Sequence, residues 1–262
     1  MAELLFWPAL LAYGEAAVAY AGNVRSPGLA GRLGTWGVRV GWLVQTALLA
    51  LQAGRSHGFP WGTWAGSLNL FVWLVVAAYL IWGCRARYRL LGLAVMPLAA
   101  LLLALARVGG GTGTGGRSRY SNVFLVLHVG LVLAAFAAFT LAAALSALYL
   151  WQERRLKARA SGVLRLRPPS LLTLETLAGR TIAFGLPALT LGVAVGFLRL
   201  GEKGGRFDAL MAVTLLTWIV YGAYLLLRYE LGWRGRRAAY LALLGFLLVI
   251  TVRLALPATH FA

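Results

Sequence analysis

Long apolar runs divide this sequence and constrain its fold more than any other feature. Several of these runs, including the one that opens with "NVFLVLHVGLVLAAF" at residues 122–136, approach or exceed the ~20 residues that a helix needs to cross a bilayer. Apolar and polar residues do not alternate within them, which excludes a β-barrel. Only 12% of the residues are charged, against about a quarter in soluble domains. The chain is therefore predicted to be all-α, as a polytopic integral membrane helix bundle.

The apolar runs predict about eight transmembrane helices within a single transmembrane domain that covers residues 1–262. Their expected positions are roughly 4–22, 36–53, 64–83, 90–106, 122–151, 171–199, 207–228 and 237–256.

The basic residues predict the orientation of these spans. A net charge of +18 would indicate nucleic acid binding in a soluble protein, but here the cations cluster in short loops, and no nucleic acid partner is expected. One set of loops and span edges, chiefly 153–167 and 228–237, holds 17 of the 25 Lys and Arg. The positive-inside rule places this set in the cytoplasm. We therefore expect both termini outside. The chain is predicted to be a multi-pass protein of the cell (inner or cytoplasmic) membrane, in contact with the lipid bilayer.

The three histidines, His57, His128 and His260, all fall on the predicted outer side. A histidine inside a span usually faces the bundle interior and is functional, yet near an interface it can simply bond a neighbouring carbonyl. For His128 we give these two readings equal weight. His260 by itself indicates only a solvated terminal side chain. As a pair, the two imidazoles could hold a haem iron from both faces, whereas zinc would need further ligands.

Other unusual residues each have a structural and a functional interpretation. Trp61 and Trp64 form either an interfacial aromatic belt or a flat apolar surface for a porphyrin, and the two are compatible. Asp208 opens a span, where an acid also suits a helix N-terminus. Glu15 is either an intramembrane relay or ion site or the partner of an arginine such as Arg25 or Arg39.

The remaining motifs give no sign of hydrolytic chemistry. The glycine-rich stretch at 109–116 lacks the Gly-Lys-Ser/Thr of a phosphate loop and is expected to be a flexible outer loop. The single Cys84 excludes an intrachain disulfide. No Ser/His/Asp arrangement, HExxH motif or useful pair of carboxylates occurs, so no catalytic residue is predicted.

Four stretches of the chain resemble the cytochrome c assembly family of haem-handling membrane proteins, especially its shorter CcsA/HemX-like branch. The resemblance covers most of the chain from about residue 36 and is most specific at "GWRGRR" and at the end of the fifth span. The stretches are 59–68, 127–157, 164–196 and 215–246.

The resemblance implies that haem b is bound on the outer face with His128 and His260 as its two axial ligands. In the family, a tryptophan-rich segment that ends in Trp-Asp supports the haem. Asp208 matches that acid, Phe207 stands where the tryptophan would be, and we expect Trp61 and Trp64 to assist. These residues form the predicted cofactor site, with the two histidines as metal ligands.

The resemblance also implies a function in cytochrome c assembly, with haem presented to a partner protein on the extracytoplasmic side. Full synthases carry a membrane histidine where this chain has Leu226, so complete synthase activity by this chain alone is not expected. A contribution to haem attachment, as a non-classical component beside a partner, stays open. The alternative is a HemX-like membrane regulator or scaffold, whose basic loops 153–167 and 228–237 contact a cytosolic haem-biosynthesis enzyme.

Overall fold

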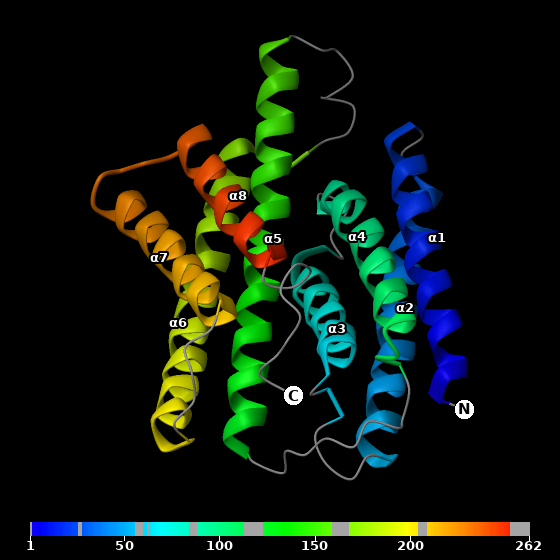
Figure 1. Ribbon diagram of the computed structural model, residues 1–262. Helices are drawn as coiled ribbons and strands as arrows, with labels where there is room; N and C mark the ends of the chain where they lie inside the picture. The colour runs from blue at the N-terminus through cyan, green and yellow to red at the C-terminus, as the bar shows by residue number, and fades with distance from the viewer. Residues whose placement is uncertain are drawn as a thin grey trace. The chain divides into compact units, whose positions relative to one another are not determined.

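The computed structural model describes residues 2–25, 28–55, 60–61, 63–83, 88–112, 123–158, 168–203 and 209–251. All regular structure in these ranges is helical, with eight α-helices and a short 3-10 turn at Ala2–Leu5 (Figure 1). The predicted all-α class is confirmed.

The chain separates into two compact units, which we call unit 1 and unit 2. Unit 1 comprises Met1–Ser121 and Ala158–Pro169, and unit 2 comprises Asn122–Lys157 and Ser170–Ala262. The helices of unit 1 are α1 (Phe6–Arg25), α2 (Leu29–Arg55), α3 (Trp64–Gly83) and α4 (Arg89–Val108). Those of unit 2 are α5 (Val123–Lys157), α6 (Leu171–Lys203), α7 (Ala209–Tyr229) and α8 (Arg236–Ile250).

The eight predicted spans correspond one to one with these helices. The largest differences are at helix ends. α2 begins seven residues before the expected residue 36, because a Gly/Arg-rich start is helical without being apolar. α5 continues six residues past residue 151, because "QERRLK" consists of good helix formers.

Five of the described helices, α3 to α7, are long and apolar enough to cross a membrane. α8 has 15 described residues, and α1 and α2 do not reach the same apolar content. The protein is therefore a polytopic membrane helix bundle. The sidedness of the spans stays a prediction, as does a single domain over residues 1–262.

In unit 1, α1 packs against α2 and α4, and α3 also packs against both of those helices. The buried Tyr20 ring of α1 lies against Gly34 of α2 and Gly92 of α4. Without side chains at these glycines, the aromatic ring fits between three helix backbones. Small residues at such contacts let helices approach closely in lipid, where no hydrophobic force draws them together.

In unit 2, α5 packs against α6 and α8, and α7 packs against the same two helices. At their common centre, the rings of Phe139 and Tyr221 stack with centroids 3.8 Å apart and planes at 15°. The Tyr221 hydroxyl donates to the carbonyl of Ala242 in α8 (3.2 Å). Gly185 of α6 and Gly245 of α8 make room for the two rings. The stacked pair therefore joins all four helices of unit 2.

Replacing Gly245 with Ala is expected to destabilise unit 2 by about 1–3 kcal/mol, the usual cost of overpacking a core. The added Cβ would lie 2.7 Å from a carbon of the Tyr221 ring. Thermal unfolding in detergent measures the effect. The matched control is Gly222→Ala in α7, where an added Cβ meets nothing within 4 Å. The control should unfold at the same or a higher temperature, because Ala favours a helix by up to about 1 kcal/mol over Gly. Equal behaviour of the two variants would contradict this packing.

Candidate functional site

Three side chains of α5 that face α6 each pack against a glycine of α6. The two helices are antiparallel. A side chain nearer the N-terminus of α5 therefore contacts a glycine nearer the C-terminus of α6. A Cβ atom added at any of these glycines would lie 2.7–2.8 Å from the α5 side chain. The three pairs are Phe139 with Gly185, Val132 with Gly192, and His128 with Gly196.

The imidazole of His128 is held by the α6 backbone. Its Nδ1 lies 2.6 Å from the carbonyl oxygen of Gly192. Because a carbonyl only accepts hydrogen bonds, we assign the proton to Nδ1, which leaves the lone pair of the neutral ring on Nε2. The contact depends on Gly196, since a Cβ there would lie 2.7 Å from Cε1 of the ring. The hydrogen bond to the Gly192 carbonyl uses Nδ1, and an iron ligand would use Nε2. The two interpretations of His128 are therefore compatible.

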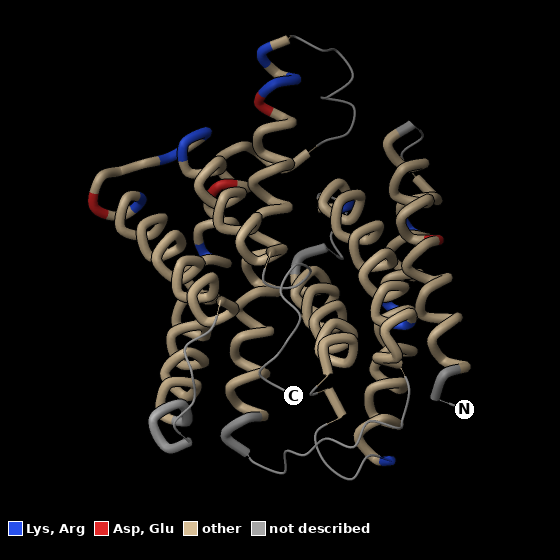
Figure 2. The backbone as a smooth tube through the Cα atoms, in the orientation of Figure 1, with Lys and Arg blue, Asp and Glu red and all other residues tan. Residues whose placement is uncertain are grey.

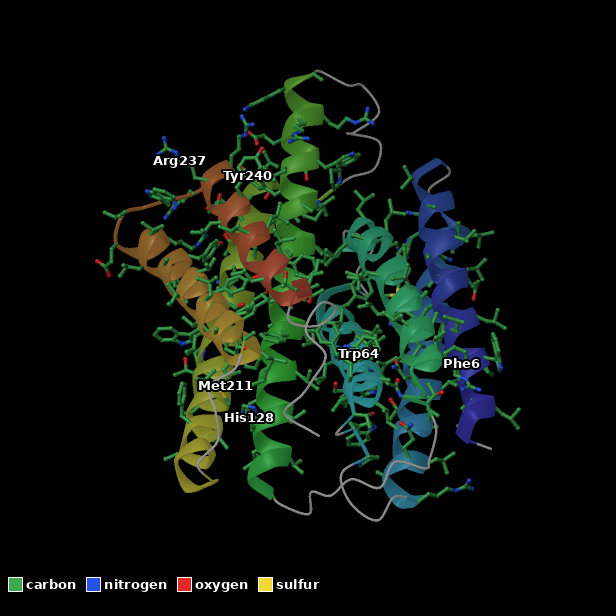
Figure 3. The ribbon with its side chains drawn as sticks, viewed as in Figure 1. Phe6, Trp64, His128, Met211, Arg237 and Tyr240 are labelled. Carbon is green, nitrogen blue, oxygen red and sulfur yellow. The ribbon has the colours of Figure 1, made fainter. Side chains whose placement is uncertain are left out.

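His128 lines a pocket between α5, α6 and α7 with about 480 Å³ of empty volume, including its open mouth. Among the described residues of this wall, only His128 has ring nitrogens. The other polar group, the Thr214 hydroxyl, is bonded to the Leu210 carbonyl of its own helix (2.8 Å). Figure 3 shows His128 and Met211 at the same end of unit 2. The pocket is lined by His128, Val132, Val193, Gly196, Phe197, Leu210, Met211, Thr214 and Leu215.

The connectivity of unit 2 places several chain segments at this end. The N-terminal part of α5, the C-terminal part of α6 and the first two turns of α7 all line the pocket. Asp208 and Phe207 immediately precede α7, but they lie outside the described residues, as do His57 and His260. Their assignment to the site stays a prediction.

Trp61 and Trp64 belong to unit 1. The Trp61 indole Nε1 donates to the side-chain oxygen of Gln52 (3.3 Å). The Trp64 ring packs against the turn after α4, 3.2 Å from where a Cβ of Gly109 would lie. Both tryptophans therefore have structural contacts inside unit 1, and a porphyrin contact stays a prediction.

Trp61 stands at one end of a buried chain of hydrogen bonds through unit 1. Tyr13 donates to Gln45 (2.7 Å), Gln45 donates to the Asn69 side chain (2.9 Å), and Asn69 donates to Gln52 (3.3 Å). These four side chains are at most 1% exposed. Buried amides satisfied by one another can join helices in an apolar solvent. The chain links α1, α2 and α3.

The same hydrogen bonds fix the start of the glycine-rich stretch, which differs from the flexible loop expected at 109–116. The carbonyl of Gly111 accepts from Gln52 Nε2 (3.1 Å) and Asn69 Nδ2 (3.4 Å). Its Cα packs so closely on the Ala65 backbone that no side chain would fit. Residues 109–112 thus form a packed turn, while 113–116 lie outside the described residues.

Two further positions can be placed. Glu15 is exposed on α1, and Arg39, one of its expected partners, stacks over Trp36 at 5.1 Å. Leu226, which stands where the resemblance puts a membrane histidine, is 62% exposed. It lies outside the packed interior of unit 2.

Gly192, Gly196 and Met211 were not among the residues predicted for the site. The stretch "GVAVG" at 192–196 is a Gly-x3-Gly pair in an apolar span, a pattern typical of close helix contacts. That signal was available in the sequence. Met211 carried no such signal, because its place in the pocket depends on how α7 packs against α5 and α6.

Replacing Gly196 with Ala is expected to displace the imidazole from the Gly192 carbonyl, because the new Cβ would clash with Cε1 and Nδ1. Nitrogen-15 NMR of histidine-labelled protein reports which ring nitrogen carries the proton. Wild-type His128 should show protonated Nδ1, and the variant a mixture of tautomers. Gly130→Ala, whose Cβ meets nothing within 4 Å, is the control and should match wild type. A wild-type spectrum in Gly196→Ala would refute the assignment.

Comparison with known proteins agrees with this architecture. The family model described as "Cytochrome C assembly protein" matches residues 61–256, which include α3 to α8. A protein named cytochrome c biogenesis protein CcsA from Mesostigma viride is 26% identical over 92% of this chain and 86% of its own length. Proteins of the same name from Microcystis aeruginosa and Gloeobacter violaceus are 27% and 26% identical, each over 83% of this chain and 82% and 81% of their own lengths. The chain belongs to the cytochrome c assembly protein family.

Proposed function

We propose that this protein binds haem at the pocket of unit 2 and presents it on the extracytoplasmic face of the cytoplasmic membrane during cytochrome c assembly. One observation carries the proposal. The His128 imidazole lines an apolar pocket with Nδ1 bonded to the Gly192 carbonyl. Histidines that bind metals usually have their second ring nitrogen held in this way.

The residues of the pocket fit such a group. An apolar cleft with one imidazole suits a porphyrin, whose large face is apolar and whose iron takes imidazole nitrogen as an axial ligand. Bound haem would supply the iron and the macrocycle that a partner cytochrome receives. The chain's own part is to orient the His128 ring, through Gly192 and Gly196, and to surround it with apolar side chains.

His260 is the proposed second axial ligand. α8 runs antiparallel to α7, so its C-terminus points towards the end of unit 2 that holds the pocket. His260 follows Thr251 by nine residues, a length of chain that spans at most roughly 30 Å. Asp208, Phe207, Trp61 and Trp64 are proposed to support the haem. The proposal covers holding and presenting haem, with attachment left to a partner protein, because Leu226 replaces the membrane histidine of full synthases.

The experiment is the absorption spectrum of purified protein, as wild type and as the His128→Ala and His260→Ala variants. We expect wild type to contain haem with a low-spin spectrum. Each variant should lose one axial ligand, so that the spectrum becomes high-spin or the bound haem falls several-fold. Because metal-ligand geometry is set by neighbouring groups, Gly196→Ala should change the spectrum in the same direction.

His57→Ala is the control, since it removes a histidine that the proposal does not use. Its spectrum should equal that of wild type. Haem-free wild-type protein, or unchanged spectra in both His128→Ala and His260→Ala, would overturn the proposal.

A further inference from the structure

The end of unit 2 opposite the pocket is strongly basic. Lys and Arg gather where α5 ends and α8 begins, as Figure 2 shows. Six Lys and Arg residues in these two segments are exposed, and two acids, Glu153 and Glu230, lie among them. We call these cations the basic patch: Arg154, Arg155, Lys157, Arg234, Arg236 and Arg237.

Side-chain contacts join the two halves of the basic patch. Arg236 of α8 pairs with Glu153 of α5 (3.5 Å). The Tyr240 side chain lies beside both Arg236 and Arg154 and interacts with them. These contacts hold the end of α5 beside the start of α8, so the cations form one surface.

The patch has more positive charge than its own acids neutralise. Glu153 is shared between Lys157 (2.7 Å) and Arg236. Glu175 is occupied by Arg228 (3.0 Å), in a pair whose side chains are only 11–12% exposed. Arg236 and Arg237 stand in the first turn of α8, where a cation opposes the helix dipole. The contact with Glu153 accounts for the position of Arg236. Helix stability does not explain the position of Arg237, and an anionic ligand outside the protein would.

Aromatic and apolar side chains lie among the cations. The guanidinium of Arg155 lies 5.8 Å from the Trp151 ring, and that of Arg237 lies 5.8 Å from the Trp233 ring. Tryptophan is enriched at the level of lipid headgroups. Leu231, next to Trp233 in the α7–α8 loop, is 65% exposed. The surface is thus both cationic and apolar.

We propose that the basic patch binds anionic phospholipid headgroups. Clusters of four to eight cations beside a membrane span are typical of such binding. Three of its cations stand in the last turn of α5, and the other three follow the C-terminus of α7. Both helices are long and apolar enough to cross a membrane, so we expect the patch to lie near the headgroups. An acidic soluble protein would match the charge, but an exposed leucine and partly exposed tryptophans beside the cations match acyl chains and the headgroup region better. This proposal does not depend on haem binding.

The experiment measures lipid retained by the full-length protein after purification in neutral detergent. Wild type is incubated with equal amounts of phosphatidylglycerol and phosphatidylcholine that carry the same acyl chains. The test variant is Arg155→Gln with Arg237→Gln, which removes two patch cations outside the Glu153 and Tyr240 contacts. The matched control is Arg32→Gln with Arg39→Gln in α2, which removes the same charge, including one arginine stacked on tryptophan.

Wild type and the control should retain phosphatidylglycerol in preference to phosphatidylcholine. The test variant should bind phosphatidylglycerol roughly tenfold or more weakly, because each cation near an anionic lipid contributes about 1 kcal/mol.

Several results would overturn the proposal. Wild type could show no preference between the lipids, or the test variant could behave as the control. Competition by free glycerol phosphate as effective as by the lipid would indicate a soluble anion site instead. An acidic soluble protein bound by wild type and released by the test variant, without any lipid preference, would indicate a protein partner.

Discussion

The glycines of α6 determine how unit 2 packs. Helices in a bilayer gain little from the hydrophobic effect and associate through close van der Waals contact. α6 provides that contact to α5 at Gly185, Gly192 and Gly196, each of which receives one large side chain. The intervals of seven and four residues keep the three glycines on one face of the helix. The last side chain along this seam is His128, so the packing that builds the unit also orients the imidazole.

The two ends of unit 2 have opposite character. At one end the pocket is apolar, and His128 faces it with its proton held by the Gly192 carbonyl. At the other end, arginines and lysine gather around Glu153 and Tyr240. The long helices α5 and α6 keep these ends apart. The two proposed functions, haem binding at the pocket and lipid binding at the basic patch, therefore belong to opposite ends of unit 2.

Much of the fold was predictable from the sequence, because a bilayer admits few structures and apolar length alone reveals helices. The end of α5 and the start of α2 were not, since helix continues there through polar residues. His128 was identified as unusual by its apolar neighbours, whereas the carbonyl that holds it lies 64 positions away. Met211 and the bond from Trp61 to Gln52 likewise depend on tertiary packing. No periodicity within one segment encodes such contacts.

The central claim is that Nε2 of His128 binds haem iron. The most direct test removes the His128 side chain and supplies imidazole from solution in its place. His128→Gly removes the ligand and leaves a space of the same shape. Added imidazole should enter that space and restore the wild-type absorption and electron paramagnetic resonance spectra in proportion to its occupancy. A His128→Gly protein that keeps the wild-type spectrum without imidazole, or that binds haem but does not respond to imidazole, would contradict the account.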